Sequence, residues 1–146
     1  MKLERRDVFP VPPAILLAAL ADKSCYEARF RMRDAEAEFD LWQQTTEGLR
    51  VRVIKQVPVR ADKLPSMLRH FVSPQMPLHS EYFWRGHQPG LVRERAHGDC
   101  RMWLGRVPAS LEGRIEVHGQ GSQSEQRMTL ELVSRITLLS RKALDK

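Results

Sequence analysis

The order in which hydrophobic patterns change along this chain most constrains its fold. A weakly alternating segment comes first, a short helical block follows, and period-two alternation then fills nearly all of Ala35 to Ile136. A second helical pattern begins just before Lys146. Successive strands with short connections favour an antiparallel sheet. We therefore expect an α+β fold in which a curved antiparallel sheet wraps around a helix, a scaffold that usually encloses an apolar cavity.

The N-terminal part of the chain predicts one strand and two short helices. Residues 2–9 form the strand, and the prolines that follow cannot donate to a ladder. Pro13 suits the first turn of a helix, and Ala14–Ala21 consists of strong helix formers. Ser24 and Glu27 stand at capping-box spacing, which predicts a second helix that ends near Met32.

Six strands are expected after the helices, and the first two form the clearest hairpin. Residues 35–45 and 49–57 alternate strictly on either side of a Glu47-Gly48 turn. The buried face of this hairpin should hold four side chains, which are Phe39, Leu41, Val51 and Val53. A slip of one residue would expose all four. The other predicted strands are 79–85, 91–97, 111–117 and 128–136, with a short helix between 61 and 72.

Length and composition indicate one globular domain over residues 1–146. Hydrophobic residues make up 42% and charged residues 29%, as in ordinary soluble proteins. The longest apolar run, Ala14–Ala21, is far shorter than the roughly 20 residues of a membrane span, and the charged N-terminus shows no signal peptide. Cys25 and Cys100 belong to no motif, which fits a reducing compartment. We therefore expect a cytoplasmic protein that is not membrane-integral.

The formal net charge of +6 raises the question of a nucleic-acid partner. Arginines are spread through every segment and interleaved with acidic residues, and no tract has five like charges in a row. Such a distribution is typical of a solvated surface. We predict no specific nucleic-acid binding, and any binding that does occur should weaken steeply with salt.

Several short segments resemble a known family. These are residues 57–71 (VPVRADKLPSMLRHF), Asp22 with residues 26–29, residues 81–84 and residues 111–113. They resemble a bacterial family of uncharacterised START-like proteins, domain of unknown function 2505, and the order of elements is similar to that of START-like helix-grip (SRPBCC) domains. The resemblance covers essentially the whole chain. It implies a helix-grip fold with seven strands and an unassigned, lipid-like ligand, and it implies no catalytic residues.

The chain departs from the family pattern at its C-terminus. The resemblance implies a long C-terminal helix that closes the cavity, whereas ten residues follow Ile136, or ~15 Å of helix. A short helix over 138–144 would leave apolar residues partly uncovered, among them Leu111, Ile115, Leu130 and Leu132. The chain is naturally short, truncated, or completed by a partner. We expect a homodimer that pairs these faces, or else an incomplete domain.

Residues that could carry a reaction form no recognisable set. The five histidines lack metal-ligand spacing, and they are His70, His79, His87, His97 and His118. His97 with Cys100 is half of a zinc motif without its second half. Most strand glutamates are out of phase with the apolar face, and Glu81 is the exception because it shares the parity of Phe83. We expect no metal, no cofactor and no catalytic residue.

Apolar side chains in the middle of the chain are candidates for the wall of a ligand cavity, because pockets are mostly apolar. Tyr82 and Trp84 share one face of their strand and Phe83 takes the other, and the sequence leaves open which face lines the cavity. The candidate ligand-binding residues are Met67, Phe71, Phe83, Trp84, Trp103, Leu111, Ile115 and Leu130.

These patterns lead to one main functional hypothesis and two alternatives. The main hypothesis is a protein that binds an apolar or amphipathic small molecule or lipid in a cavity under the sheet. The first alternative is a cyclase- or hydratase-like enzyme on the same fold, which would need a carboxylate paired with a histidine or arginine inside the cavity. The second alternative is an interaction module that dimerises through an exposed sheet face.

Overall fold

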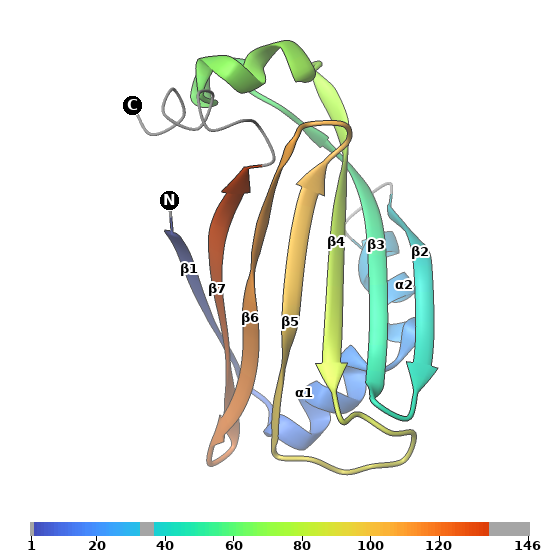
Figure 1. The fold of residues 1–146 in the computed structure, drawn as a ribbon. Helices are drawn as coiled ribbons and strands as arrows, with labels where there is room; N and C mark the ends of the chain where they lie inside the picture. The colour runs from blue at the N-terminus through green and yellow to red at the C-terminus, as the bar shows by residue number, and fades with distance from the viewer. Residues whose placement is uncertain (1, 33–36, 135–146) are drawn as a thin grey trace.

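A seven-stranded antiparallel sheet dominates the computed structural model, which describes residues 2–32 and 37–134 (Figure 1). Its elements in chain order are β1 (Lys2–Phe9), α1 (Pro13–Leu20), α2 (Lys23–Met32), β2 (Ala37–Thr45), β3 (Gly48–Pro58), the short 3₁₀ helices η1 (Ala61–Lys63) and η2 (Ser66–Phe71), β4 (Gln75–Arg85), β5 (Arg95–Leu104), β6 (Ala109–Gln120) and β7 (Gln123–Ser134). The strands lie in the order β1-β7-β6-β5-β4-β3-β2. The expected α+β class and the curved sheet of seven antiparallel strands are confirmed.

One face of the sheet, called the inner face below, carries the hydrophobic core. Its deeply buried side chains include Leu49, Val51, Trp84, Cys100, Ile115, Val117 and Leu130. The register places Val51, Tyr82 and Cys100 in one row across three strands. Helix α1 packs against β5, β6 and β7 and inserts Leu16 into this core. Helix α2 lies at the other edge, where Tyr26 meets Phe39 and Trp42 of β2 edge to face.

The hairpin of β2 and β3 forms as predicted, but one of its expected core residues faces the other way. The pairing register shifts between Phe39 and Leu41, so Asp40 is an extra residue in β2. A bulge of this kind reverses the alternation beyond it. Trp42 therefore pairs with Val51 and packs against the core, and Leu41 points to the outer face. The prediction that Leu41 is a core residue is wrong for this reason.

Three local predictions also differ from the structure. Helix α2 ends at Met32 as expected, but the Ser24 backbone N–H donates to Asp22 Oδ1 at 2.9 Å, so Asp22 and not Ser24 is the cap. The short helix between 61 and 72 is a pair of 3₁₀ helices. The strand predicted at 91–97 begins four residues later, because residues 86–94 form a loop. The predicted C-terminal helix lies outside the described residues.

Candidate functional site

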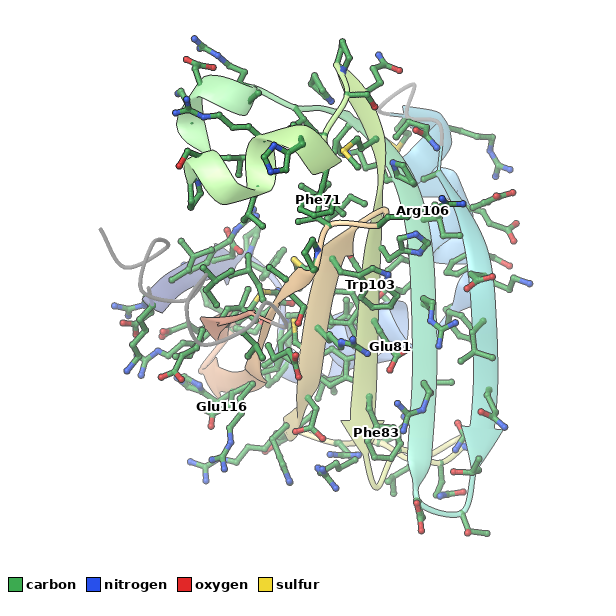
Figure 2. All side chains as sticks on the ribbon, turned by 45° about the horizontal axis from the view of Figure 1, so that its top comes forward. Phe71, Glu81, Phe83, Trp103, Arg106 and Glu116 are labelled. Carbon is green, nitrogen blue, oxygen red and sulfur yellow. The ribbon has the colours of Figure 1, made fainter. Side chains whose placement is uncertain are left out.

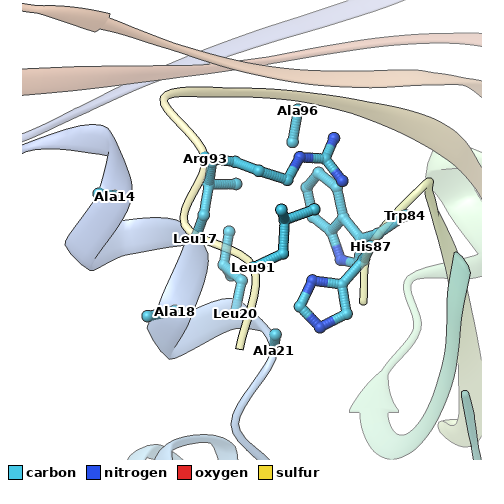
Figure 3. A pocket seen from close by; sticks show the side chains of 10 residues that line it. All are labelled: Ala14, Leu17, Ala18, Leu20, Ala21, Trp84, His87, Leu91, Arg93 and Ala96. Carbon is cyan, nitrogen blue, oxygen red and sulfur yellow. The ribbon is translucent and has the colours of Figure 1, made fainter. Parts of the chain in front are cut away.

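A pocket lies between α1 and the loop 86–94 that joins β4 to β5, and we call it the α1 pocket (Figure 3). Its volume is ≈ 30 Å³, which is room for about two water-sized groups. The pocket is lined by Ala14, Leu17, Ala18, Leu20, Ala21, Trp84, His87, Leu91, Arg93 and Ala96. It is thus a small, mostly apolar space with a few nitrogen-bearing side chains.

The apolar wall of the α1 pocket follows from the composition of the helix. The side of α1 that lines the pocket carries small alanines, so the loop can approach the helix closely while Leu17 and Leu20 supply apolar surface. The opposite wall comes from the inner-face ends of two strands, with Trp84 near the end of β4 and Ala96 near the start of β5. Such a wall suits an aliphatic group.

The indole nitrogen of Trp84 is the most unusual polar atom in the pocket. Trp84 is 4% exposed, and its Nε1 is buried with no hydrogen-bond partner among the described residues. A buried indole N–H normally finds an acceptor. Figure 3 shows Trp84, His87 and Arg93 around the same space. The wall of the pocket therefore contains a buried donor that no described residue uses.

Hydrogen bonds between side chains and backbone carbonyls hold the loop and the side chain of Arg93 in place. Arg93 donates from Nη1 to the Arg85 carbonyl at 3.0 Å and from Nε to the Arg95 carbonyl at 3.2 Å. The carbonyl of His87 accepts from Gln44 Nε2 at 2.6 Å. Burial, and then the positive charge of Arg93, lower the pKa of His87, so its imidazole is neutral at pH 7.

The opposite, outer face of the sheet carries cross-strand ion pairs. Glu81 accepts from Arg50 Nη1 at 2.9 Å and pairs with Arg52 Nη2 at 2.7 Å. Partial burial raises the pKa of Glu81, but the hydrogen bonds and charges of Arg52 and Arg50 outweigh it and hold the pKa below its ordinary value. Glu81 is thus an ionised structural partner on the face away from the α1 pocket.

Two predicted cavity residues also lie on the outer face (Figure 2). Because Trp84 faces the core, its neighbour Phe83 points outward, where the guanidinium groups of Arg50 and Arg85 lie over its ring. Trp103 stacks on His79 with ring centroids 4.9 Å apart. Phe83 and Trp103 therefore face away from the α1 pocket, contrary to expectation, and Tyr82 and Trp84 are the side chains of β4 that lie on the inner face.

The other candidate ligand-binding residues are dispersed. Ile115 and Leu130 are packed in the core, and Leu111 lies beside that core on the same inner face. Phe71 is 43% exposed at the end of η2, far along the sheet from the α1 pocket. The side chain of Met67 is outside what the structure describes. Of the candidates with described side chains, Trp84 is the one that lines the α1 pocket. The ligand-binding roles remain predictions.

Sequence reasoning missed the loop residues of the pocket. His87, Leu91 and Arg93 were assigned to a hairpin turn and a strand, so they were not considered as pocket walls. The available signal was the Gln88-Pro89-Gly90 run, because proline and glycine at that spacing favour a longer connection. A helix rich in alanine beside such a loop is a second signal of close approach.

A buried carboxylate near the far end of the outer face gives a testable pH dependence. Glu125 is 2% exposed and lies within 2.6 Å of Arg6, 3.4 Å of His118 and 3.2 Å of Arg127. Burial raises its pKa, but the hydrogen bond and charge of Arg6, with the charges of His118 and Arg127, outweigh this and lower the pKa below its ordinary value. A carboxylate whose pKa is lowered by folding stabilises the fold fully at pH values above its unfolded pKa of about 4.3. This stabilisation is lost as the pH falls through its folded pKa.

Replacing Glu125 with glutamine should therefore lower the urea midpoint of unfolding at pH 7. The difference from the unmodified protein should shrink as the pH is lowered from 7 to about 3, because the stability supplied by an ionised Glu125 is lost below the unfolded pKa of about 4.3. Glu131→Gln is the matched control, since Glu131 is exposed on the same face of the same strand. If Glu125→Gln lowers the urea midpoint by the same amount at pH 7 and at about pH 3, this account is contradicted.

Two further searches of the described part of the chain gave negative results. No three side chains among His, Cys, Asp and Glu come together as a metal ion would require in residues 2–32 and 37–134. Within those same ranges, no helix has the length and apolarity needed to cross a bilayer.

The fold and the pocket define a small α+β protein with a curved seven-stranded antiparallel sheet and a pocket beneath one helix. Within that class, the chain belongs to the family described as Protein of unknown function (DUF2505), whose model matches residues 5–143. The family resemblance seen in the sequence is thereby confirmed. A search of curated proteins gives no significant match.

Two solved structures are similar to this chain. The Mll3558 protein from Rhizobium loti has 15% sequence identity and a TM-score of 0.50, over 97% of this chain and 86% of that one. An uncharacterised protein from Rhizobium leguminosarum has 10% identity and a TM-score of 0.44, over 99% of this chain and 87% of the other. The likeness to the Rhizobium loti protein concerns the fold alone.

Proposed function

We propose that this protein is a single helix-grip (START-like) domain that binds an apolar or amphipathic small molecule between the inner face of the sheet and the helices. The α1 pocket is the observation that carries the proposal. It combines an apolar helix wall with a buried donor, Trp84 Nε1, that has no partner among the described residues. Mostly apolar pockets with a few placed polar groups are the usual form of small-molecule sites.

The side chains of β5 also favour a hollow beneath the sheet. Ala96, Gly98 and Cys100 occupy successive inner-face positions on this strand, and all three are small. β5 is the middle strand of β6-β5-β4, so the small residues lie near the centre of the sheet. A row of small side chains lets a ligand or a helix approach the backbone there.

The positions of two reactive groups favour binding over catalysis. Glu81, the strand carboxylate whose parity suggested a catalytic role, is paired with two arginines on the outer face. Burial raises the pKa of the Cys100 thiol to about 12, so it stays protonated and is a poor nucleophile. Glu81 and Cys100 therefore supply neither the general acid nor the nucleophile that the enzyme alternative would need.

A cytoplasmic location and a homodimer remain parts of the proposal. Cys25 and Cys100 are both free thiols, which suits a reducing compartment. The argument for a dimer depended on residues 138–144, which lie outside the described residues. Light scattering at micromolar concentration measures the subunit number directly.

A fluorescence titration tests the binding function, and the structure decides which tryptophan should report it. A long-chain fatty acid should change tryptophan emission saturably. Trp84→Phe should remove most of this change because Trp84 lines the α1 pocket, whereas Trp103→Phe should keep it because Trp103 lies on the outer face. No saturable change with any member of a panel of fatty acids, sterols and apolar metabolites would refute the proposal.

A further inference from the structure

The unused donor of Trp84 limits what the α1 pocket can hold. An indole nitrogen has a hydrogen to donate and no lone pair to accept with, so only an acceptor atom can satisfy it. The atom is buried and has no partner among the described residues. Since buried polar groups are nearly always hydrogen-bonded, the occupant of this pocket should present an oxygen acceptor to Trp84 Nε1.

The charge at the pocket further restricts that acceptor. No carboxylate of the described residues lies within ion-pair distance of Arg93, although arginines elsewhere on the sheet pair with acids. Two of its five N–H groups are used by the Arg85 and Arg95 carbonyls, which leaves others for a further acceptor. The lowered pKa of His87 reflects this same unbalanced positive charge as its second cause, after burial. An anion is thus favoured over a neutral acceptor, and a cationic group is disfavoured.

The size and the apolar wall of the pocket identify the kind of anion. A volume of ≈ 30 Å³ admits a head group as small as a carboxylate, and any chain attached to that group must extend out of the pocket. Leu17, Leu20 and Leu91 surround the space with aliphatic surface. A carboxylate head group matches the charge and the volume of the pocket, and an attached alkyl chain would leave the pocket along these aliphatic side chains.

We propose that the α1 pocket binds the carboxylate of an aliphatic acid, with Arg93 as its counterion and Trp84 Nε1 as a hydrogen-bond donor. This assignment rests on the proposed ligand-binding function and adds the chemical class of the ligand. A charge-assisted hydrogen bond to a carboxylate favours the acid over the matching alcohol by about tenfold or more in affinity.

Three eight-carbon probes that differ only in their head group test the inference. Sodium octanoate, 1-octanol and octylamine are titrated at pH 7, with calorimetry as the readout. Octanoate should bind at least about tenfold more tightly than octanol, and octylamine should bind more weakly than octanol. Sodium acetate is a fourth probe, which lacks the alkyl chain. If acetate binds as tightly as octanoate, the ligand is a small free carboxylate. If acetate binds much more weakly, the ligand is a fatty acid.

Variants of Arg93 distinguish recognition of the ligand's carboxylate from binding of its alkyl chain. Arg93→Met should abolish the preference for octanoate while octanol binds as before, and Arg93→Lys, which keeps the charge, should restore part of it. Arg95→Met is the matched control because Arg95 is exposed on the outer face two residues away, and it should behave like the unmodified protein. Thermal melts verify that each variant is folded.

The outcomes distinguish failure of this inference from failure of the proposed function. Equal affinity for octanoate and octanol, or a preference for octanoate that survives in Arg93→Met, overturns the carboxylate assignment and leaves ligand binding intact. Saturable binding of none of the four probes overturns the carboxylate assignment, and the broader fatty-acid, sterol and metabolite panel then decides whether ligand binding itself stands.

Discussion

Replacing Gly113 with alanine should destabilise this protein more than any other single methyl addition in the sheet. A β-carbon at Gly113 would lie 1.7 Å from the carbonyl oxygen of Thr129 on the neighbouring strand. Overpacking costs about 1–3 kcal/mol where side chains can move aside. Here the obstacle is backbone, so β6 and β7 must separate, and we expect a loss of about 3 kcal/mol or more in the free energy of unfolding.

The measurement is urea unfolding of Gly113→Ala beside Gly121→Ala. Gly121 lies in the β6–β7 turn with φ of +67°, and nothing lies within 4 Å of a β-carbon built there. Its replacement should cost about 1–2 kcal/mol, which is the strain of a side chain in the left-handed region. Equal losses for the two variants would show that the close approach at Gly113 is not rigid.

The parts of the fold that were predictable from the sequence depend on local periodicity. The β2–β3 hairpin and α1 each follow from a repeat that is visible within about ten residues. The bulge at Asp40 is not visible in this way, because a single extra residue leaves two alternating stretches that both look regular. Leu41 and Trp42 are both apolar, so either could have been the core residue.

The side of β4 that faces the core could not be predicted, for a physical reason. Both faces of this strand carry aromatic side chains, and the outer one is stabilised by cations instead of by burial. Phe83 is covered by the guanidinium groups of Arg50 and Arg85, which come from the neighbouring strand and from β4 itself. Arg50 stands 33 positions before Phe83 in the sequence, so this contact leaves no local signal.

The candidate site was predictable in kind but not in position. An apolar cavity was expected, with Trp84 as one of eight candidate lining residues, and α1 was expected as a helix. The polar character of the α1 pocket depends on Trp84 Nε1 having no hydrogen-bond partner and on Arg93 having no ion-pair partner among the described residues. Both are properties of three-dimensional packing, since acidic residues such as Glu94 stand next to Arg93 in the sequence.

Truncation of Leu130 tests whether the inner face is the hydrophobic core that holds the sheet together. Leu130 is 2% exposed and lies opposite Gly113 of β6 and Leu3 of β1. Leucine-to-alanine changes in a packed core cost about 2–5 kcal/mol, because the cost of the cavity left behind adds to the loss of apolar burial. With a glycine opposite, little can collapse into the space, so we expect Leu130→Ala to fall in the upper half of that range.

Val133→Ala is the matched control, because Val133 lies on the same strand with its side chain on the outer face and is 37% exposed. Its truncation should cost less than about 1 kcal/mol, as expected for a partly solvated side chain. Unfolding in urea gives both values. If Val133→Ala costs as much free energy of unfolding as Leu130→Ala, or more, then the outer face is covered in solution. The homodimer hypothesis would then have to explain that coverage.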